Sequence, residues 1–576
     1  MAGKMAVWKL LNRKADFQAL RDRFGLDPVT IRLLCNRFIN TPEAVRKFLY
    51  PEVADLHDPF LMKGMDKACA VIQEAIAAGE KIRIIGDYDA DGVFSTYILF
   101  DALKKLGAEV DYRIPERVRD GYGMNERLVR EASQDEISLI LTCDNGISAA
   151  EQIALAYSLN MKVIVTDHHE IPEVLPEAEA LLNPKLENCD YPFRELCGAG
   201  VAMKLAVALG ADVQEYIGFA AVATVCDIVT LLGENRTIVK LGLQKLHQCT
   251  HLGFRALAEG NQISLTMLNT SDIGYRIGPC INASGRLASA ELAMQLLLAS
   301  DEVMAKNLAT ELIQLNEERK EKTQEAVDTA IRLIEQQNAL TDAVLVLLLK
   351  DCHESVAGIV AGKIKERYNR PTIILTYGKD CVKGSARSTE YYNIVEELRA
   401  CSELLQHFGG HPMAAGLSMA EEKVEELRCR LNERMELSEE LLEGKLSIDL
   451  QVPFAYVSEE RIDEIQLLEP YGPGNPSPLF AARNVIACGA QKIGREKSFM
   501  KFFLQDEDGI RMEALCFQEY DKIRQGLEEK YGEEEFVKLI QRKPNKVRLS
   551  VVYDMGINEY MAIRTPQIII RDYIML

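Results

Sequence analysis

Apolar runs alternate with amphipathic segments from residue 81 to residue 183, and this alternation predicts a parallel α/β fold. The apolar runs are short and rich in β-branched residues, as strands are, and the segments between them have helical apolar spacing. Strands that alternate with helices in this way are typical of a parallel sheet with helices on its faces. The predicted strands are residues 81–86, 108–114, 137–144, 161–166 and 179–183.

The hydrophobic pattern changes after this first α/β part. Residues 199–340 are mainly helical, and the apolar spacing of their last part predicts one long connecting helix. A second α/β unit begins at Ala343, and β-type segments return from about residue 446. These last segments predict a small barrel or sandwich. We therefore expect an N-terminal helical region, a catalytic α/β domain, a connecting helix, a smaller α/β domain and a C-terminal β domain, at residues 1–80, 81–300, 301–340, 341–437 and 446–576.

Composition indicates a globular protein in a reducing compartment. The chain has 576 residues, of which 48% are hydrophobic, and no apolar run approaches the roughly 20 residues that cross a bilayer. The N-terminus lacks the apolar stretch of a secretory signal. The 14 cysteines include no Cys-x-x-Cys pair, which argues against a disulfide framework or a zinc site. We expect a cytoplasmic protein with no membrane partner.

The net charge of −20 is unusual for a protein that binds nucleic acid, because such proteins normally present a basic face. Net charge governs solubility and long-range steering, and it says little about a single groove. The acidic balance therefore argues against nonspecific duplex binding but is compatible with a local basic track.

Carboxylates or histidines follow an apolar run at four places. In a parallel sheet, ligands bind beyond the carboxyl ends of the strands, so these side chains are expected to converge at one edge. The four stretches are IRIIGDYDADG (82–92), LILTCDNG (139–146), VIVTDHH (163–169) and TVCDIV (224–229).

Each stretch taken alone also has a structural interpretation. Carboxylates spaced like those of residues 87–91 are also found in solvated acidic turns. They are found in EF-hand loops as well, but the downstream ligand spacing of an EF-hand is missing here. Asp144 alone is typical of a turn, and Asp227 alone is typical of a helix cap. Together the four stretches offer oxygen and nitrogen ligands that suit Mn²⁺ or Mg²⁺. Two such cations about 4 Å apart can activate a water and stabilise an in-line attack at phosphorus.

At these residues the chain resembles a known family. GDYDADG, CDNG, TDHH and CDIV have the order of the motifs of the DHH phosphoesterase superfamily. Within that superfamily, roughly residues 80–570 resemble the RecJ family of bacterial single-strand-specific exonucleases. The second α/β unit resembles the associated DHHA1 domain, and the C-terminal domain resembles an OB fold. Stretches that carry the resemblance include IPERVRDGYG (114–123), IGPCINASGRL (277–287), KGSARS (383–388), FGGHPMAAG (408–416) and LEPYGPGNPSPLF (468–480).

The resemblance implies a role for each residue of the four stretches. Asp144 would bridge two ions, and Asp87 and Asp167 would hold waters or orient ligands. His169 would contact the scissile phosphate or the leaving group. The implied metal ligands are Asp89, Asp91, Asp144, His168 and Asp227.

A second set of residues is expected to bind substrate. The resemblance assigns phosphate contacts to Ser385, Arg387 and His411, with His353 close by. Arg117 and Arg286 are suited to phosphate contact or to structural salt bridges. The Gly409-Gly410 pair can expose amides to an anion or form a tight turn. Tyr122 is suited to stacking on a base or to packing within its loop.

Alternating aromatic residues in the C-terminal domain are also candidates for single-strand contact. Phe499, Lys501, Phe502 and Phe503 could track a strand, although such alternation is also typical of a half-buried sheet.

Three positions depart from the family pattern. Ile85 stands where many relatives outside the RecJ family carry a metal-binding histidine, so one ion should have fewer protein ligands. Cys280 stands where an arginine is common, and Cys352 stands where a tryptophan often precedes the histidine. None of these departures removes an implied ligand.

The resemblance implies a 5′→3′ exonuclease of DNA repair and recombination that releases 5′-mononucleotides from single-stranded DNA and uses two Mn²⁺ or Mg²⁺ ions. One alternative is a DHH phosphodiesterase that acts on short oligonucleotides, cyclic dinucleotides or pyrophosphate. Another is a non-catalytic scaffold, against which the full set of acids and histidines argues. Single-stranded DNA is the expected partner, with a single-strand-binding protein and a helicase as further candidates.

Overall fold

The computed structural model describes residues 7–13, 17–378, 381–435, 444–494, 498–560 and 563–576, and the chain forms two compact units. The first unit contains Met1–Tyr50, Ser438–Tyr471 and Asn475–Leu576. The second unit contains Pro51–Leu437 and Gly472–Gly474. The predicted N-terminal region, residues 1–80, is therefore divided between the two units.

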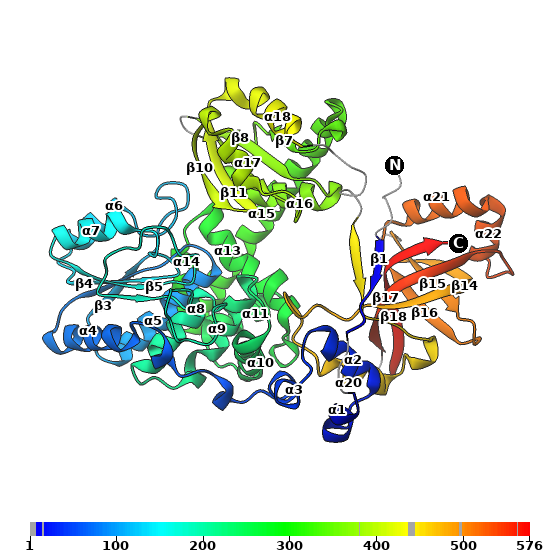
Figure 1. The fold of residues 1–576 in the computed structure, drawn as a ribbon, viewed down its shortest axis with the longest axis horizontal. Helices are drawn as coiled ribbons and strands as arrows, with labels where there is room; N and C mark the ends of the chain where they lie inside the picture. Colours follow the sequence, from blue (N-terminus) through cyan, green and yellow to red (C-terminus); the bar gives the residue numbers. More distant parts are fainter. Residues whose placement is uncertain (1–6, 14–16, 379–380, 436–443, 495–497, 561–562) are drawn as a thin grey trace. The chain divides into compact units, whose positions relative to one another are not determined.

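The second unit begins with a five-stranded parallel sheet of order β3-β2-β4-β5-β6, which confirms the predicted fold class. Strands β2 and β4 are buried along their whole length, which explains their mainly apolar sequences, and the buried Arg83 of β2 pairs with Asp111 and Asp135. Helices α4 and α5 cover one face and helices α6 and α7 the other (Figure 1). The bounds are α4 Met65–Ala78, β2 Ile82–Ile85, α5 Ala90–Lys105, β3 Val110–Arg113, α6 Glu126–Gln134, β4 Leu139–Cys143, α7 Ala150–Ser158, β5 Lys162–Thr166 and β6 Ala180–Leu182.

A helical layer follows this sheet, as expected for residues 199–340. The apolar run before Asp227 is helix α9, and Asp227 is its C-cap, so this acid follows a helix and not a strand of the sheet. The run spans 14 residues and is rich in alanine, which suits a buried helix better than a strand. The helices of the layer are α8 Gly198–Ala208, α9 Val213–Cys226, α10 Gly233–Leu246, α11 Leu252–Gly260, α13 Gly278–Leu287 and α14 Glu291–Leu297.

Helix α15, Glu302–Gln336, connects this layer to a second five-stranded sheet, as the apolar spacing predicts (Figure 1). The second sheet has the order β10-β11-β9-β8-β7, in which only the β7–β8 pair is parallel. Helix α16 packs on strands β8 and β9. The bounds are β7 Leu345–Leu348, α16 Glu354–Tyr368, β8 Thr372–Tyr377, β9 Val382–Arg387, α17 Ile394–Ala400, β10 Leu405–His411, β11 Ala414–Met419 and α18 Val424–Glu433.

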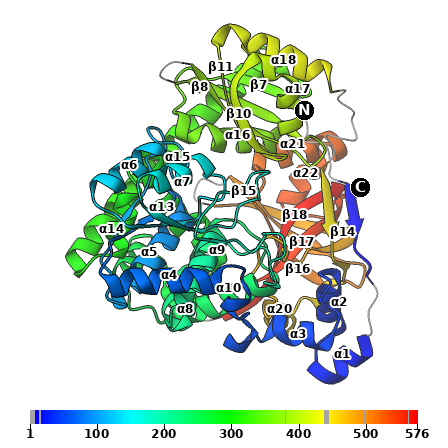
Figure 2. The ribbon, with the colours of Figure 1, turned by 60° about the vertical axis from the view of Figure 1, so that its left-hand side comes forward.

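The first unit contains a barrel. Its strands have the order β13-β14-β15-β16-β18-β17, and an additional pairing of β14 with β17 closes the sheet (Figure 2). The strand β1, Val7–Leu10, pairs with β12, Lys445–Ile448, and the sequence had indicated only helices in this N-terminal region. The other strands are β13 Leu450–Gln451, β14 Phe480–Ile493, β15 Phe499–Gln505, β16 Arg511–Cys516, β17 Arg548–Tyr560 and β18 Ile563–Met575.

The helices of the first unit are α1 Phe17–Phe24, α2 Pro28–Asn36, α3 Pro42–Leu49, α20 Glu459–Gln466, α21 Tyr520–Tyr531 and α22 Glu533–Ile540. Throughout the described part of the chain, every helix is too short or too polar to cross a membrane.

Candidate metal centre

The loop between β2 and α5 carries three carboxylates in different environments. Asp89 is the N-cap of α5, and its Oδ1 accepts a hydrogen bond from the Gly92 amide at 3.1 Å. The Asp91 carboxylate accepts the amides of Gly198 and Ala199, at 2.6 and 2.7 Å, at the start of α8. Asp87 is buried. The start of one helix therefore fixes Asp91, while Asp87 and Asp89 remain available to a ligand.

Asp144 lies at the end of β4 in a left-handed backbone conformation, with φ of +62°. Its carbonyl accepts the Tyr122 hydroxyl at 2.7 Å, and its amide donates to the Thr166 carbonyl. The start of α8 approaches so closely that a Cβ on Gly198 would lie 2.7 Å from the Asp144 carboxylate. The Asp144 carboxylate is therefore held in one position by its backbone and by its neighbours.

Asp167 organises the two histidines that follow it. Its Oδ1 accepts the amides of His168 and His169 and lies 2.7 Å from His169 Nδ1. Its Oδ2 accepts the Ile147 amide at 2.9 Å. Burial alone would lower the pKa of His169, but the hydrogen bond and the charge of Asp167 raise it to about 9. Burial and then the charge of His169 lower the pKa of His168 to about 3, so His168 is the neutral ring of the pair.

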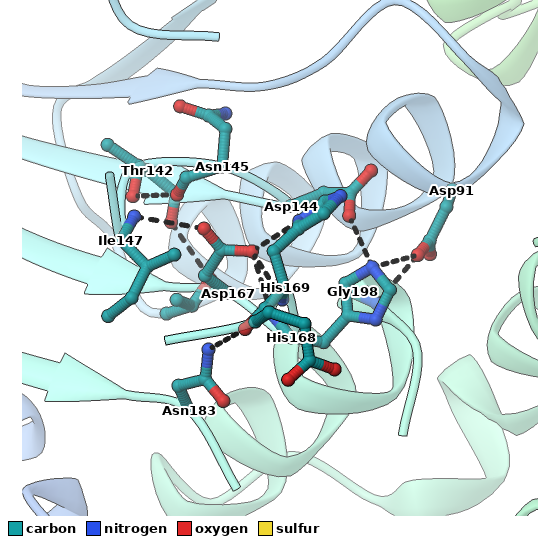
Figure 3. Close-up of polar contacts among 12 residues, drawn as sticks. Asp91, Thr142, Asp144, Asn145, Ile147, Asp167, His168, His169, Asn183 and Gly198 are labelled. Carbon is teal, nitrogen blue, oxygen red and sulfur yellow. Dashed lines mark hydrogen bonds and ion pairs between the residues drawn. The ribbon is translucent and has the colours of Figure 1, made fainter. Parts of the chain in front are cut away.

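The strand ends and the end of α9 bring these side chains into one cluster (Figure 3). His168 Nε2 lies 3.1 Å from Asp144 Oδ1 and 3.7 Å from both Asp91 Oδ2 and Asp227 Oδ2. Ligand atoms lie within 4.8 Å of one another in three groups: Asp91, His168 and Asp227; Asp87, Asp89 and Asp144; and Asp144, His168 and His169.

The electrostatics of the cluster fit bound cations. Burial and neighbouring carboxylates raise the pKa of Asp91 to about 6 and of Asp227 to about 8. The same causes raise the pKa values of Asp87 and Asp144 well above their usual range. Among the described residues, no hydrogen-bond partner reaches the buried atoms Asp87 Oδ1 and Asp227 Oδ2. Repelling carboxylates with free oxygens, beside a neutral imidazole, form a ligand set that suits divalent cations such as Mn²⁺.

A second site, which we call the arginine pocket, lies beside the acidic loop within the same unit. It has a volume of about 310 Å³ and is lined by Arg117, Arg286, Ser385 and Arg387, among other residues. The Arg117 guanidinium lies 3.8 Å from the centre of the Tyr88 ring, so the pocket adjoins the 87–91 loop. Burial and then the charges of Arg117 and Arg319 lower the pKa of Arg286 to about 10. Several cations that repel one another in a small pocket indicate an anion site.

Comparisons with known proteins agree with this geometry. The DHH family, N-terminal domain, matches residues 81–226; the DHHA1 domain matches 341–437; and the RecJ OB domain matches 448–572. The single-stranded-DNA-specific exonuclease RecJ of Bacillus subtilis is 38% identical over 99% of this chain and 71% of its own length. The chain belongs to the RecJ family. The RecJ of Haemophilus influenzae is 32% identical over 95% of this chain and 96% of its own length.

Solved structures of the RecJ family match as well. The crystal structure of RecJ from Thermus thermophilus in complex with Mn²⁺ has a TM-score of 0.82 and 28% identity, and it covers 98% of this chain and 79% of its own. The structure of the same protein in complex with Mg²⁺ has a TM-score of 0.76. The predicted relationship to the RecJ family is therefore confirmed.

The expected phosphate-binding residues of this RecJ family member lie at three places. Arg117, Arg286, Ser385 and Arg387 line the arginine pocket. Gly409, Gly410 and His411 lie instead on the exposed end of strand β10. His353 is the N-cap of α16 and lines a neighbouring cavity of about 1120 Å³.

The residues at the three positions that depart from the family pattern are all buried. Ile85 is fully buried in the apolar core beside the sheet. Cys280 is buried on α13, where its thiol donates to the Arg276 carbonyl. Cys352 is buried at the start of α16. All three side chains are therefore buried packing residues.

Some residues of the two sites were not identified from the sequence. Asn282 accepts the Ala90 amide at 2.8 Å and so supports the acidic loop. Arg319 projects from α15 close enough to shift the pKa of Arg286. Lys383 lines the arginine pocket and pairs with Glu354 at 2.9 Å. Asn282 lies in a stretch that resembles the family, but nothing in the sequence showed that α15 runs beside the pocket.

The candidates in the barrel are only partly available to a strand of DNA. Phe502 is 1% exposed and belongs to the core, so it cannot be a contact residue. Lys501 pairs with Glu513, and Phe503 lies under the Arg542 guanidinium at 4.2 Å. Phe499 packs edge-on against Phe517. The alternation of these aromatics therefore reflects mainly the two faces of a barrel strand.

Proposed function

We propose that this protein is a metal-dependent exonuclease that degrades single-stranded DNA to 5′-mononucleotides in the 5′→3′ direction. The observation that carries the proposal is the pairing of a buried Asp/His cluster with a separate arginine pocket in one unit. Relatives at 38% and 32% identity are named single-stranded-DNA-specific exonucleases, and a relative has been solved with Mn²⁺ and with Mg²⁺.

The cluster would hold two cations. Asp91, His168 and Asp227 would hold one, and Asp87 and Asp89 the other, with Asp144 between them because it approaches both groups. Asp87, for which the sequence implied an orienting role, thereby becomes a ligand candidate. When bound, two such cations supply an activated water and neutralise charge that develops on the phosphate.

The chain's own residues position the reacting groups. His169, paired with Asp167, would carry a proton at neutral pH and present it toward the scissile phosphate or the leaving oxygen. The Tyr122 hydroxyl lies 3.1 Å from His169 Nδ1 and donates to the Asp144 carbonyl. It would therefore hold His169 and Asp144 in fixed positions relative to each other. Asp167 would act by holding both histidines in place.

The arginine pocket would bind the 5′-terminal phosphate. It adjoins the acidic loop but contains none of the residues of the cluster, so it suits a phosphate other than the scissile one. With the terminal phosphate in the pocket, the next phosphate along the chain would reach the cluster, and cleavage there releases one nucleotide. The 5′→3′ direction and the release of 5′-mononucleotides would both follow from a pocket that lies one nucleotide away from the cluster.

The barrel, which matches the RecJ OB domain, would bind the same single strand further along. A single-strand-binding protein and a helicase as partners, and a cytoplasmic location, remain predictions from the sequence.

A labelled-end experiment tests the proposal. The protein would be incubated with Mn²⁺ and with single-stranded or blunt duplex DNA labelled at the 5′ or the 3′ end. Early release of a labelled mononucleotide from the 5′-labelled single strand is expected, while the 3′ label remains in long products. Equal digestion of blunt duplex, or cleavage of dinucleotides alone, would contradict the proposal. The second of these results would instead support a phosphodiesterase of short oligonucleotides.

A further inference from the structure

Ile228 has a left-handed backbone conformation directly after the candidate ligand Asp227. Its φ is +59°, and it follows the C-cap of α9. Helices that end in this way usually place glycine or asparagine here, because a β-branched side chain crowds the backbone. The Ile228 side chain is 72% exposed, so burial does not offset this strain. A strained residue that gains little from packing indicates a role in binding.

A second exposed side chain, Tyr275, lies on a segment that packs against the same end of α9. Tyr275 belongs to the π-helical turn η4, Ile273–Ile277, and is 80% exposed. The residues around this turn approach the helix closely: a Cβ on Gly278 would lie 2.4 Å from Cys226 Sγ. Short π-helical segments occur frequently at functional sites. We call Ile228 and Tyr275 together the apolar shelf.

The apolar shelf and the arginine pocket adjoin different parts of the metal cluster. The shelf begins at Asp227, whose Oδ2 lies 3.7 Å from His168 Nε2. The pocket adjoins the 87–91 loop through Arg117, which lines the pocket and lies over the Tyr88 ring. A strand with its 5′ phosphate in the pocket and its next phosphate at the cluster would leave past Asp227, along the shelf.

We propose that the apolar shelf contacts the bases and sugars of the nucleotides on the 3′ side of the scissile phosphate. This inference rests on the proposed exonuclease function. The ring of Tyr275 and the branched aliphatic side chain of Ile228 suit the faces of a base and a deoxyribose. Every base has such a face, so the shelf raises affinity for the remaining strand without reading its sequence.

Variants with matched controls test the shelf. Ile228→Gly and Tyr275→Ser are expected to raise KM for a 5′-phosphorylated single strand roughly fivefold or more, with kcat little changed. Ile228→Gly should keep or raise the unfolding temperature, because glycine accepts the left-handed conformation. The control Gln262→Gly changes an exposed residue with φ of +57° after α11, and Met267→Ala removes a side chain that is 74% exposed. Both controls should leave KM unchanged.

Strands that lack bases show where the shelf acts. For the wild type, abasic nucleotides at the second and third positions from the 5′ end should raise KM, and for the two shelf variants they should raise it no further. Shelf variants with wild-type KM overturn the shelf, as does a fall in kcat alone, which indicates a displaced Asp227. If the wild type digests no single strand, the proposed function fails and the shelf fails with it.

Discussion

His169 Nδ1 lies 2.7 Å from Asp167 Oδ1, and that oxygen also accepts the backbone amides of His168 and His169. One buried carboxylate thus holds the half-exposed His169 ring directly and His168 through its backbone amide. Carboxylates commonly support metal-bound histidines through the far ring nitrogen, and here the same support is given to the histidine expected to face the phosphate.

We predict that Asp167→Asn lowers activity by about 10- to 100-fold, the usual effect of removing such a support. The asparagine side chain has the same shape as the aspartate side chain, but its NH2 group is a hydrogen-bond donor. It would face the backbone amides of Ile147, His168 and His169, which also donate. The measurement is kcat on single-stranded DNA together with Mn²⁺ affinity by calorimetry. Unchanged values of both would show that Asp167 does not orient the histidines.

Asp144→Asn should abolish turnover yet stabilise the metal-free protein. Burial and the charges of Asp91 and other carboxylates raise the pKa of Asp144, so its charge opposes folding when no cation is bound. Removing that charge should raise the free energy of unfolding in a chelator by roughly 1 kcal/mol or more. Asparagine also tolerates the φ of +62° at this position.

The same variant should lose stabilisation by metal. Added Mn²⁺ should raise the unfolding temperature of the wild type, because it binds the folded chain, and should have little effect on Asp144→Asn. Equal metal-induced shifts in the two proteins would contradict a bridging position for Asp144. Glu43→Gln, far along the chain in α3, provides a control for the loss of one carboxylate.

Arg387→Gln should reduce the preference for 5′-phosphorylated over 5′-hydroxyl strands by about tenfold, the worth of one charge-assisted hydrogen bond. Burial lowers the pKa of Arg387, which indicates a guanidinium that lacks a compensating anion. Competition between the two substrates measures the preference directly. Arg367→Gln, on the exposed last turn of α16, is the matched control and should leave the ratio unchanged.

The sequence predicted those features that a local pattern determines. The strands β2, β4 and β5 are mainly apolar because both faces of the sheet are covered, and the carboxylates that follow them were therefore visible at the end of each apolar run. Helix α15 was predicted over nearly its full length, because a single apolar stripe repeats along it.

Features that depend on tertiary contact could not be predicted. The apolar spacing indicated helices over residues 199–340, but only the folded chain shows that the end of helix α9 brings Asp227 Oδ2 to within 3.7 Å of His168 Nε2. Strand β1 pairs with β12 more than 400 residues later in the chain, so its partner is invisible locally. Phe502 and Phe503 are neighbours on one strand and therefore point to opposite faces of the sheet. The sequence does not show which of these faces is the barrel core, whereas the closed sheet places Phe502 in the core.

His251 should make stability depend on pH in a window outside the metal centre. This N-cap of α11 lies 3.1 Å from the Tyr97 hydroxyl and packs edge-on against Phe219, and burial lowers its pKa. The folded state therefore binds fewer protons than the unfolded state below about pH 6.5, the usual histidine value, so stability is full above that pH and falls as the pH decreases.

His251→Asn keeps a capping side chain but removes this titration. The variant should be less stable than the wild type at pH 7.5, because it loses the ring contacts, and the difference should narrow toward pH 5. Because one proton is involved, the difference between the two free energies of unfolding can change by at most about 1.4 kcal/mol per pH unit. Chemical denaturation of both proteins between pH 5 and pH 7.5 measures this difference. A stability difference that stays constant or widens as the pH falls would show that His251 is protonated in the folded protein.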